Sequence, residues 1–166
     1  MKVFLIGLPG SGKSTIGAAL AGRLAMEFVD LDKEIEAKEG MIIPEIFSSK
    51  GEDYFRRVES EMLRQWAILD RNFIMSTGGG TPCFYDGISV INNNGVSVFL
   101  DEQIEVIVAR LENNQHRPLL QSANVEDMRS KLQRLRDARL PFYQQASIIV
   151  SSPTVGKVLE KLRIKN

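Results

Sequence analysis

The sequence predicts an α/β protein in which a parallel β-sheet is covered by helices on both faces. Short apolar runs alternate with segments of helical periodicity along the chain, an order that is typical of parallel sheets. The first run, Val3 to Ile6, is continuously apolar, as expected of a strand buried on both faces. A glycine-rich turn then leads from this strand directly into an amphipathic helix.

The same patterns predict the position of each element. The expected strands lie at residues 3–6, 28–29, 73–75, 96–100 and 148–150, and the expected helices at residues 14–24, 102–111, 125–140 and 154–163. Residues 33–70 are expected to be mostly helical and to be divided into shorter helices at Gly40 and Gly51. Residues 92–95 are expected to form a turn, and Pro141 to disturb the end of its helix. Without an internal repeat or linker, residues 1–166 are expected to form one domain.

Composition limits the class of partner. Lys plus Arg and Asp plus Glu each number 21, so the formal net charge is zero and no overall basic field exists to attract nucleic acid or an anionic membrane. The single cysteine, Cys83, cannot form an intrachain disulfide. No apolar segment approaches the length of a signal-peptide core or the roughly 20 residues that span a bilayer. We therefore expect a cytoplasmic monomer that binds a small molecule rather than nucleic acid or a membrane.

Residues 7–14, Gly-Leu-Pro-Gly-Ser-Gly-Lys-Ser, fit the phosphate-binding P-loop pattern G-x-x-x-x-G-K-[ST]. Its glycines allow backbone N–H groups to point at phosphate oxygens, and the following helix adds its positive N-terminus. A glycine-rich turn with a solvated lysine is the simpler alternative, but the position between a buried strand and a helix favours the P-loop. ATP and Mg²⁺ are the expected cofactors, with Ser14 as a metal ligand and Lys13 on the transferred phosphate. The residues expected to hold the nucleotide phosphates are Gly10, Ser11, Gly12, Lys13, Ser14 and Thr15.

Two acids follow the second expected strand. Asp30 and Asp32 are two residues apart, so both carboxylates share one face if they lie on the strand. Phosphoryl transfer needs anions that hold Mg²⁺ and an acceptor for the proton of the attacking hydroxyl. Alternatively, Asp32 is simply the N-cap of the next helix, and the spacing does not decide between the two roles. The position at the carboxyl end of a strand favours a functional role.

A glycine run and several arginines are further candidates. Residues 77–80, Thr-Gly-Gly-Gly, follow the third expected strand and allow the backbone to approach a ligand closely, although a plain turn is the alternative. Arg56, at the edge of the buried stripe of its helix, and Arg139 carry planar forks suited to a carboxylate. Arg117 lies in the polar segment 112–124, where a loop that closes over ATP would bring it to the phosphates. For each arginine, a solvated surface position is the simpler interpretation.

Taken together, these motifs resemble the shikimate kinase family, which has a nucleoside-monophosphate-kinase-like fold. The resemblance covers essentially the whole chain. It rests on residues 7–14, 30–32, 51–59, 76–80, 117–120 and 139–143. It implies a three-layer P-loop fold with a five-stranded parallel sheet in the order 2-3-1-4-5, a substrate-binding region at about 32–60 and a lid at about 112–124. It also implies transfer of the γ-phosphate of MgATP to the 3-hydroxyl of shikimate, in aromatic amino-acid biosynthesis.

The resemblance also implies a role for each site residue. Asp32 would hold the shikimate hydroxyls and prepare the attacking one, while Asp30 would meet Mg²⁺ through water. The carboxylate would be bound by Arg56 and Arg139, beside the backbone of residues 78–80. Arg117 would reach the phosphates on closure of the lid. Arg110 and Pro153 match the positions that enclose adenine in the family. The acidic residue that often follows the last strand in the family is absent from this sequence.

Two other functions remain open from the sequence. A related small-molecule kinase, acting on gluconate or a nucleoside monophosphate, would keep the P-loop and lid but use the acids and arginines differently. A non-catalytic nucleotide-binding module would bind ATP without turnover and would have no use for an acceptor site.

Overall fold

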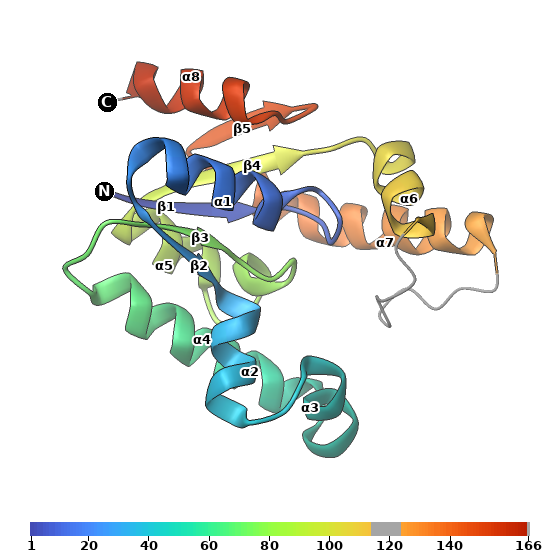
Figure 1. Ribbon diagram of the computed structural model, residues 1–166. Coiled ribbons are helices and arrows are strands. Elements are labelled where there is room, and N and C mark those ends of the chain that lie inside the picture. Colours follow the sequence, from blue (N-terminus) through green and yellow to red (C-terminus); the bar gives the residue numbers. More distant parts are fainter. Residues whose placement is uncertain (114–123, 166) are drawn as a thin grey trace.

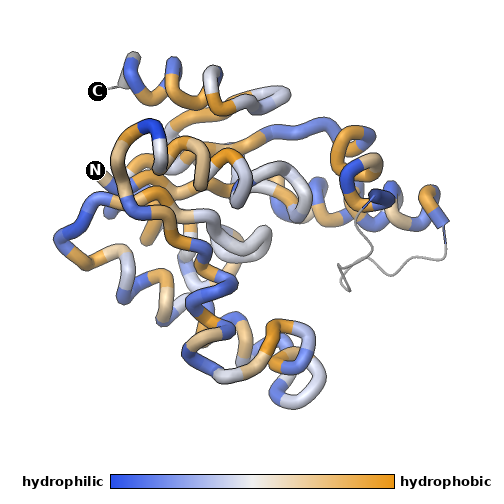
Figure 2. The backbone as a smooth tube through the Cα atoms, in the orientation of Figure 1, coloured by the Kyte–Doolittle hydropathy of each residue, from blue (hydrophilic) through white to orange (hydrophobic). Residues whose placement is uncertain are grey.

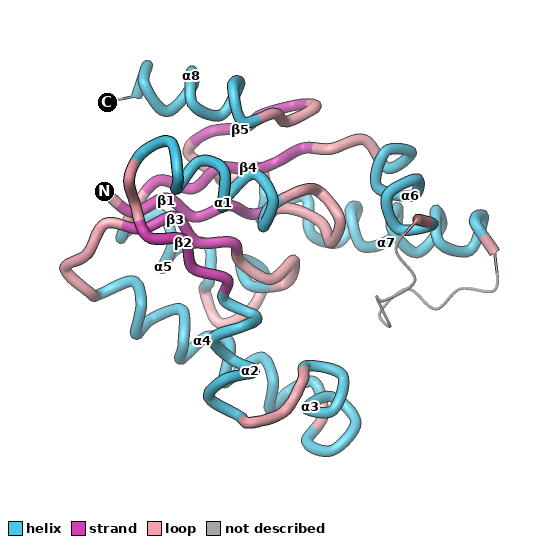
Figure 3. The backbone as a smooth tube through the Cα atoms, viewed as in Figure 1, coloured by secondary structure: helices cyan, strands magenta, loops and turns pink. Residues whose placement is uncertain are grey.

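The computed structural model describes residues 1–113 and 124–165 and contains a five-stranded sheet (Figures 1 and 3). The strand order is β2-β3-β1-β4-β5, and all four pairings are parallel. The strands are β1 (Lys2–Ile6), β2 (Glu27–Asp30), β3 (Phe73–Ser76), β4 (Val96–Asp101) and β5 (Ile148–Ser151). The predicted α/β class and the predicted sheet order are both confirmed.

Helices connect the strands and cover the sheet. They are α1 (Lys13–Leu24), α2 (Leu31–Glu39), α3 (Ile43–Lys50), α4 (Glu52–Ile68), the short 3₁₀ helix η1 (Thr81–Cys83), α5 (Gly87–Asn94), α6 (Ile104–Glu112), α7 (Val125–Tyr143) and α8 (Val155–Lys165). The predicted division of residues 33–70 is confirmed, since α2 ends at Gly40 and α3 at Gly51. Among the described residues, no helix is long and apolar enough to cross a membrane.

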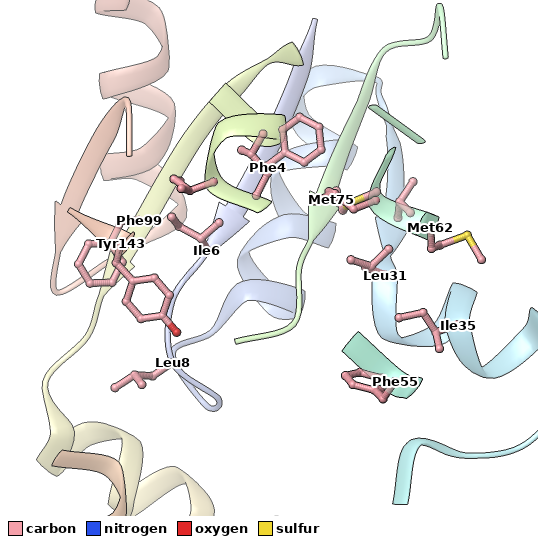
Figure 4. Close-up of a cluster of buried hydrophobic side chains, with 14 of the residues drawn as sticks. Phe4, Ile6, Leu8, Leu31, Ile35, Phe55, Met62, Met75, Phe99 and Tyr143 are labelled. Carbon is pink, nitrogen blue, oxygen red and sulfur yellow. The ribbon is translucent and has the colours of Figure 1, made fainter. Parts of the chain in front are cut away.

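The core consists of two apolar layers, one on each face of the sheet. Successive side chains of a strand point to opposite faces, so Val3 and Leu5 join one layer while Phe4 and Ile6 join the other. The first layer packs against α1 and α8, and the second against α4, α5 and α7 (Figures 1 and 4). Because both faces are covered, the strands are hydrophobic almost throughout (Figure 2).

The predicted turn at residues 92–95 is wrong, because residues 92–94 form the last turn of α5 and only Gly95 lies beyond it. Ile88 and Ile91 are buried and three residues apart, which gives this segment one apolar face. The asparagines occupy the opposite, more exposed face, and Asn94 donates a side-chain hydrogen bond to the carbonyl of Val90 within the helix. The run of asparagines therefore reflects exposure rather than the end of helical structure.

Pro141 does not end its helix, and α7 continues to Tyr143. Proline removes the hydrogen bond to the carbonyl four residues earlier, here that of Asp137. Asp137 is an exposed residue of the helix surface, where an unpaired carbonyl can be hydrogen-bonded by water. Leu132 and Tyr143 are buried on either side of the proline, and this packing holds the last turn in place.

Parallel pairing places the sequence motifs along one edge of the sheet. The glycine-rich turn follows β1, Asp30 ends β2, and residues 77–80 follow β3. These three strands are adjacent in the sheet, so their carboxyl ends lie side by side, which is where open α/β sheets bind ligands.

Candidate active site

The turn between β1 and α1 forms a cradle for an anion. Gly10 (φ 79°) and Gly12 (φ 96°) adopt left-handed backbone conformations that other residues rarely take. Gly12 is the N-cap of α1 and provides no side-chain cap, so no capping side chain occupies the positive N-terminus of the helix. The buried hydroxyl of Ser11 has no hydrogen-bond partner in the part of the chain that the structure describes. An orphaned donor in an uncapped turn fits a phosphate ligand.

Lys13 lies at the first position of α1 and is largely buried. Its Nζ donates to the carbonyl oxygens of Gly7 at 2.9 Å and Leu8 at 2.8 Å. These bonds hold the ammonium group across the mouth of the loop, where an incoming phosphate can compete for it. Lys13 is also close enough to Asp32 to oppose the other effects on the pKa of that carboxyl.

Oxygen ligands suited to Mg²⁺ lie beside the cradle. Ser14 Oγ donates to Asp30 Oδ2 at 3.0 Å and lies 3.2 Å from Ser76 Oγ at the end of β3. No group of three or more metal-ligating side chains occurs within residues 1–113 and 124–163. One hydroxyl and one carboxylate match Mg²⁺, which keeps several waters and takes further ligands from substrate phosphates. The residues present therefore fit MgATP.

The acid pair differs from the prediction that both carboxylates lie on a strand. β2 ends at Asp30, and Asp32 lies in the first turn of α2. Asp30 is the N-cap, because its Oδ1 accepts hydrogen bonds from the backbone N–H groups of Asp32 at 3.1 Å and Lys33 at 3.3 Å. The capping role that the sequence left open for Asp32 thus belongs to Asp30. The side chain of Asp32 consequently has no capping function.

Asp32 is an unusually basic carboxylate. Its pKa is raised from 3.8 to about 6, mainly by burial and next by the negative charges of Asp30 and Glu59. Asp32 Oδ1 lies 3.1 Å from the position that a β-carbon on Gly78 would occupy, so the carboxyl faces the glycine run after β3. A group with a pKa near 6 is ionised at neutral pH and can still accept a proton.

Arg56 is buried rather than solvated, although its neighbour Arg57 is exposed. Arg56 Nη1 donates to Glu59 Oε1 at 2.8 Å, one helical turn further along α4. Glu59 Oε2 in turn accepts a hydrogen bond from Thr81 Oγ1 at 2.8 Å, and the guanidinium carbon lies 4.3 Å from the ring centroid of Phe84. These contacts fix the orientation of the fork.

Glu59 and Thr81 were not among the candidate residues from the sequence. The three-residue spacing of Arg56 and Glu59 on a helix is a usable signal for an ion pair, because such residues lie on one face. Nothing in the sequence indicates Thr81, because its contact with Glu59 spans 22 residues and depends on the packing of η1 against α4.

The glycine run lies directly against these charged side chains. A β-carbon on Gly78 would lie 2.7 Å from Glu59 Oε2, one on Gly79 2.7 Å from Arg139 Nη1, and one on Gly80 2.5 Å from Arg56 Nη1. All three distances are shorter than real β-carbon contacts, so a side chain at any of the three positions would force the charged group next to it to shift. The structure thus brings Arg56, from α4, and Arg139, from α7, to one short loop.

The two residues proposed for adenine lie on different elements. Arg110 Nη1 donates to the carbonyl of Gly10 at 3.1 Å, and Arg110 Nη2 donates to Glu102 Oε2 at 2.9 Å. Glu102, which is buried and was not predicted, orients this arginine toward the P-loop. Pro153 is buried in the loop between β5 and α8. Arg117 and residues 114–123 of the expected lid lie outside the described residues.

The fold and this site define a P-loop kinase with a site for a small acceptor next to the phosphate cradle. A family model described as shikimate kinase matches residues 9–161, and the chain belongs to the shikimate kinase family. A shikimate kinase of Parabacteroides distasonis is 38% identical over 148 residues, which cover 89% of this chain and 85% of the relative.

Solved structures agree with this assignment. The crystal structure of shikimate kinase from Bacteroides thetaiotaomicron matches with a TM-score of 0.89 and 34% identity, over 99% of this chain and 96% of the other. Shikimate kinase from Acinetobacter baumannii, in complex with shikimate, matches with a TM-score of 0.90 and 31% identity, over 99% and 94% of the two chains. The enzyme is therefore an ATP-dependent kinase that uses Mg²⁺.

Proposed function

We propose that this enzyme transfers the γ-phosphate of MgATP to the 3-hydroxyl of shikimate, using the residues grouped around the glycine run. One observation carries the assignment of the acceptor site. Three charged side chains lie beside residues 78–80, next to the P-loop: the guanidinium groups of Arg56 and Arg139 and the basic carboxylate of Asp32. Two guanidinium groups can bind a carboxylate of the acceptor, and the carboxylate of Asp32 can accept a hydrogen bond and then the proton of an acceptor hydroxyl. Shikimate carries both groups, and the similar A. baumannii enzyme binds it.

The donor side is supplied by residues 10–15. Backbone N–H groups of the turn and of the first turn of α1 would bind the phosphate oxygens, and Lys13 would exchange its carbonyl partners for the transferred phosphate. Ser14 would be a direct ligand of Mg²⁺ and Asp30 a ligand through water. Bound Mg²⁺ supplies charge neutralisation at the phosphate oxygens. Arg110 and Pro153 would enclose the adenine ring.

On the acceptor side, Asp32 would orient the attacking hydroxyl and accept its proton. The carboxylate is ionised at neutral pH yet basic enough for this role, because burial and two neighbouring acids raise its pKa to about 6. Arg56 and Arg139 would hold the acceptor by its carboxylate, and Arg117 would stabilise charge on the phosphates when residues 112–124 close. Positioning and electrostatics, without a covalent intermediate, suffice for phosphoryl transfer.

The experiment is coupled ADP release with MgATP and a panel of shikimate, quinate, gluconate, AMP and CMP. Turnover confined to shikimate, and lost in Lys13→Ala and Asp32→Asn, is the expected result. A nucleoside monophosphate as the preferred acceptor would contradict the carboxylate-binding role of Arg56 and Arg139. Gluconate, which also carries a carboxylate, would leave that role in place but contradict shikimate as the substrate. Binding of ATP without turnover of any acceptor would contradict catalysis itself.

We further propose that the enzyme acts as a cytoplasmic monomer that does not bind nucleic acid. The formal net charge of zero supports the absence of polyanion binding. Sedimentation of the purified protein at micromolar concentration tests the monomer. A species of twice the chain mass would overturn it.

A further inference from the structure

The hydroxyl of Tyr143 ties the end of α7 to the glycine run. The side chain is fully buried, and its ring lies 5.0 Å, centroid to centroid, from that of Phe99 on β4 (Figure 4). Its hydroxyl donates a 2.6 Å hydrogen bond to the carbonyl oxygen of Gly79. Burial raises the pKa of Tyr143, so the hydroxyl keeps its proton and remains a donor at any pH at which the enzyme is assayed.

Holding this carbonyl also fixes the next N–H group. The peptide between Gly79 and Gly80 is planar and trans, so the N–H of Gly80 points opposite to the carbonyl oxygen of Gly79 and away from Tyr143. Within the described part of the chain, the N–H of Gly80 makes no hydrogen bond. The peptide between two glycines rotates easily about its flanking bonds, and the hydrogen bond from the tyrosine hydroxyl restrains its orientation.

The same hydroxyl meets Arg139, which lies one turn earlier on α7. The positive charge of Arg139 and a hydrogen bond from it both oppose the rise in the pKa of Tyr143 that burial causes. Arg139 Nη1 also lies 2.7 Å from the position of a β-carbon on Gly79. The phenol, the Gly79 peptide and the guanidinium therefore touch one another.

We propose that Tyr143 is a positioning residue for the acceptor, which acts by orienting the Gly79–Gly80 peptide and the Arg139 guanidinium toward the acceptor's carboxylate. It contacts neither the acceptor nor ATP. This inference rests on the proposed function, because it assumes that the acceptor carries a carboxylate held by Arg139.

The test is the Tyr143→Phe variant, which removes the hydroxyl and keeps the ring packed on Phe99. We expect KM for shikimate to rise roughly tenfold, as for the loss of one or two hydrogen bonds around a charged group. KM for ATP and kcat should change less than about twofold. The control is Leu132→Val, which leaves a small cavity at a fully buried position of the same helix and loosens α7 without touching the glycine run.

A second readout separates positioning from general loosening. The methyl ester of shikimate lacks the carboxylate charge, so the wild type should bind it far more weakly than shikimate. In Tyr143→Phe the ratio of the two KM values should shrink roughly tenfold, because the clamp on the carboxylate is already impaired. In Leu132→Val the ratio should remain that of the wild type.

The outcomes are distinct. A wild type that does not phosphorylate shikimate overturns both the proposed function and this inference. Turnover of shikimate by the wild type, with a Tyr143→Phe variant whose shikimate KM and ester ratio are unchanged, overturns only the role of the hydroxyl. If circular dichroism shows that Tyr143→Phe is unfolded while Leu132→Val is folded, the hydroxyl serves the fold and the inference is also overturned.

Discussion

Arg56 Nη1 lies 2.5 Å from the position that a β-carbon on Gly80 would occupy. The same nitrogen donates to Glu59, and the guanidinium carbon lies 4.3 Å from the ring centroid of Phe84, so a shift away from residue 80 would disturb these contacts. The glycine is therefore required by the arginine, rather than by the turn, since the backbone of Gly80 is right-handed helical (φ −89°, ψ −11°) and accessible to any residue.

Gly80→Ala should consequently displace Arg56 and weaken acceptor binding. We expect kcat/KM for shikimate to fall roughly 100-fold, the effect of misplacing a binding group by about 1 Å, while ATP binding stays within a few-fold of wild type. Steady-state kinetics with each substrate varied in turn check this.

The matched control is Gly22→Ala on α1, where a β-carbon would meet nothing within 4 Å. This variant should be as active as the wild type and more stable by roughly 0.5–1 kcal/mol, because alanine is the better helix former. Equal kinetic effects of the two substitutions would rule out a steric role for Gly80.

Asp32→Asn should inactivate the enzyme and stabilise the ligand-free fold. The pKa of Asp32 is higher in the folded protein, about 6, than the ordinary value of 3.8. Between about pH 4 and 6 the folded state therefore binds more protons than the unfolded state, and stability falls as pH rises through this window. Asparagine avoids the charge, and we expect a gain of roughly 1–3 kcal/mol at pH 7.5 that disappears near pH 4.

Urea unfolding of both proteins at pH 4 and pH 7.5 measures this difference. Asp70→Asn serves as the control, since Asp70 is exposed and should show the same stability as the wild type at both values. A variant of Asp32 that is less stable than the wild type at pH 7.5 would contradict the raised pKa.

The rate should depend on the ionisation of Asp32. We expect kcat/KM for shikimate to decline below about pH 6, as the carboxylate becomes protonated. Glu59→Gln removes one of the negative charges that raise this pKa, so the decline should begin at a lower pH, in addition to a loss of rate from the weakened hold on Arg56.

Glu36→Gln is the control for charge alone. Glu36 also raises the pKa of Asp32, but less than Asp30 and Glu59 do, and it does not touch Arg56. In Glu36→Gln the pH at which kcat/KM declines should therefore shift less than in Glu59→Gln. The value of kcat/KM at higher pH should be unchanged. If the decline of kcat/KM at low pH begins at the same pH in Glu59→Gln as in the wild type, a group other than Asp32 causes the decline.

Glu102→Gln should weaken ATP binding alone. Glu102 accepts a 2.9 Å hydrogen bond from Arg110 Nη2. The other terminal nitrogen of the guanidinium, Nη1, donates to the carbonyl of Gly10 in the P-loop. Loss of the charge should release Arg110 and raise KM for ATP roughly three- to tenfold, because Arg110 is half exposed and the pair is partly screened. KM for shikimate should remain unchanged, and a parallel rise in both constants would point to a general structural effect.

Local patterns predicted most of the architecture correctly. The continuous apolar strands, the P-loop spacing and the break at Gly51 each depend on neighbours in the chain, and all three are found where expected. The errors arose where local patterns compete. Asparagine is common in turns, but the buried Ile88 and Ile91 keep residues 92–94 helical. Proline usually ends a helix, but the burial of Tyr143 keeps the last turn of α7 in place beyond Pro141.

The sequence by itself determined the α/β class, the phosphate cradle and the residue types available for an acceptor. Tertiary structure alone decided which of those residues meet. Asp32 gains its raised pKa from burial and from Glu59, 27 positions away, and Tyr143 reaches Gly79 across 64 positions. The physical reason is that hydrogen-bond partners and burial are properties of packed elements, whereas turn, strand and helix preferences are properties of a few consecutive residues.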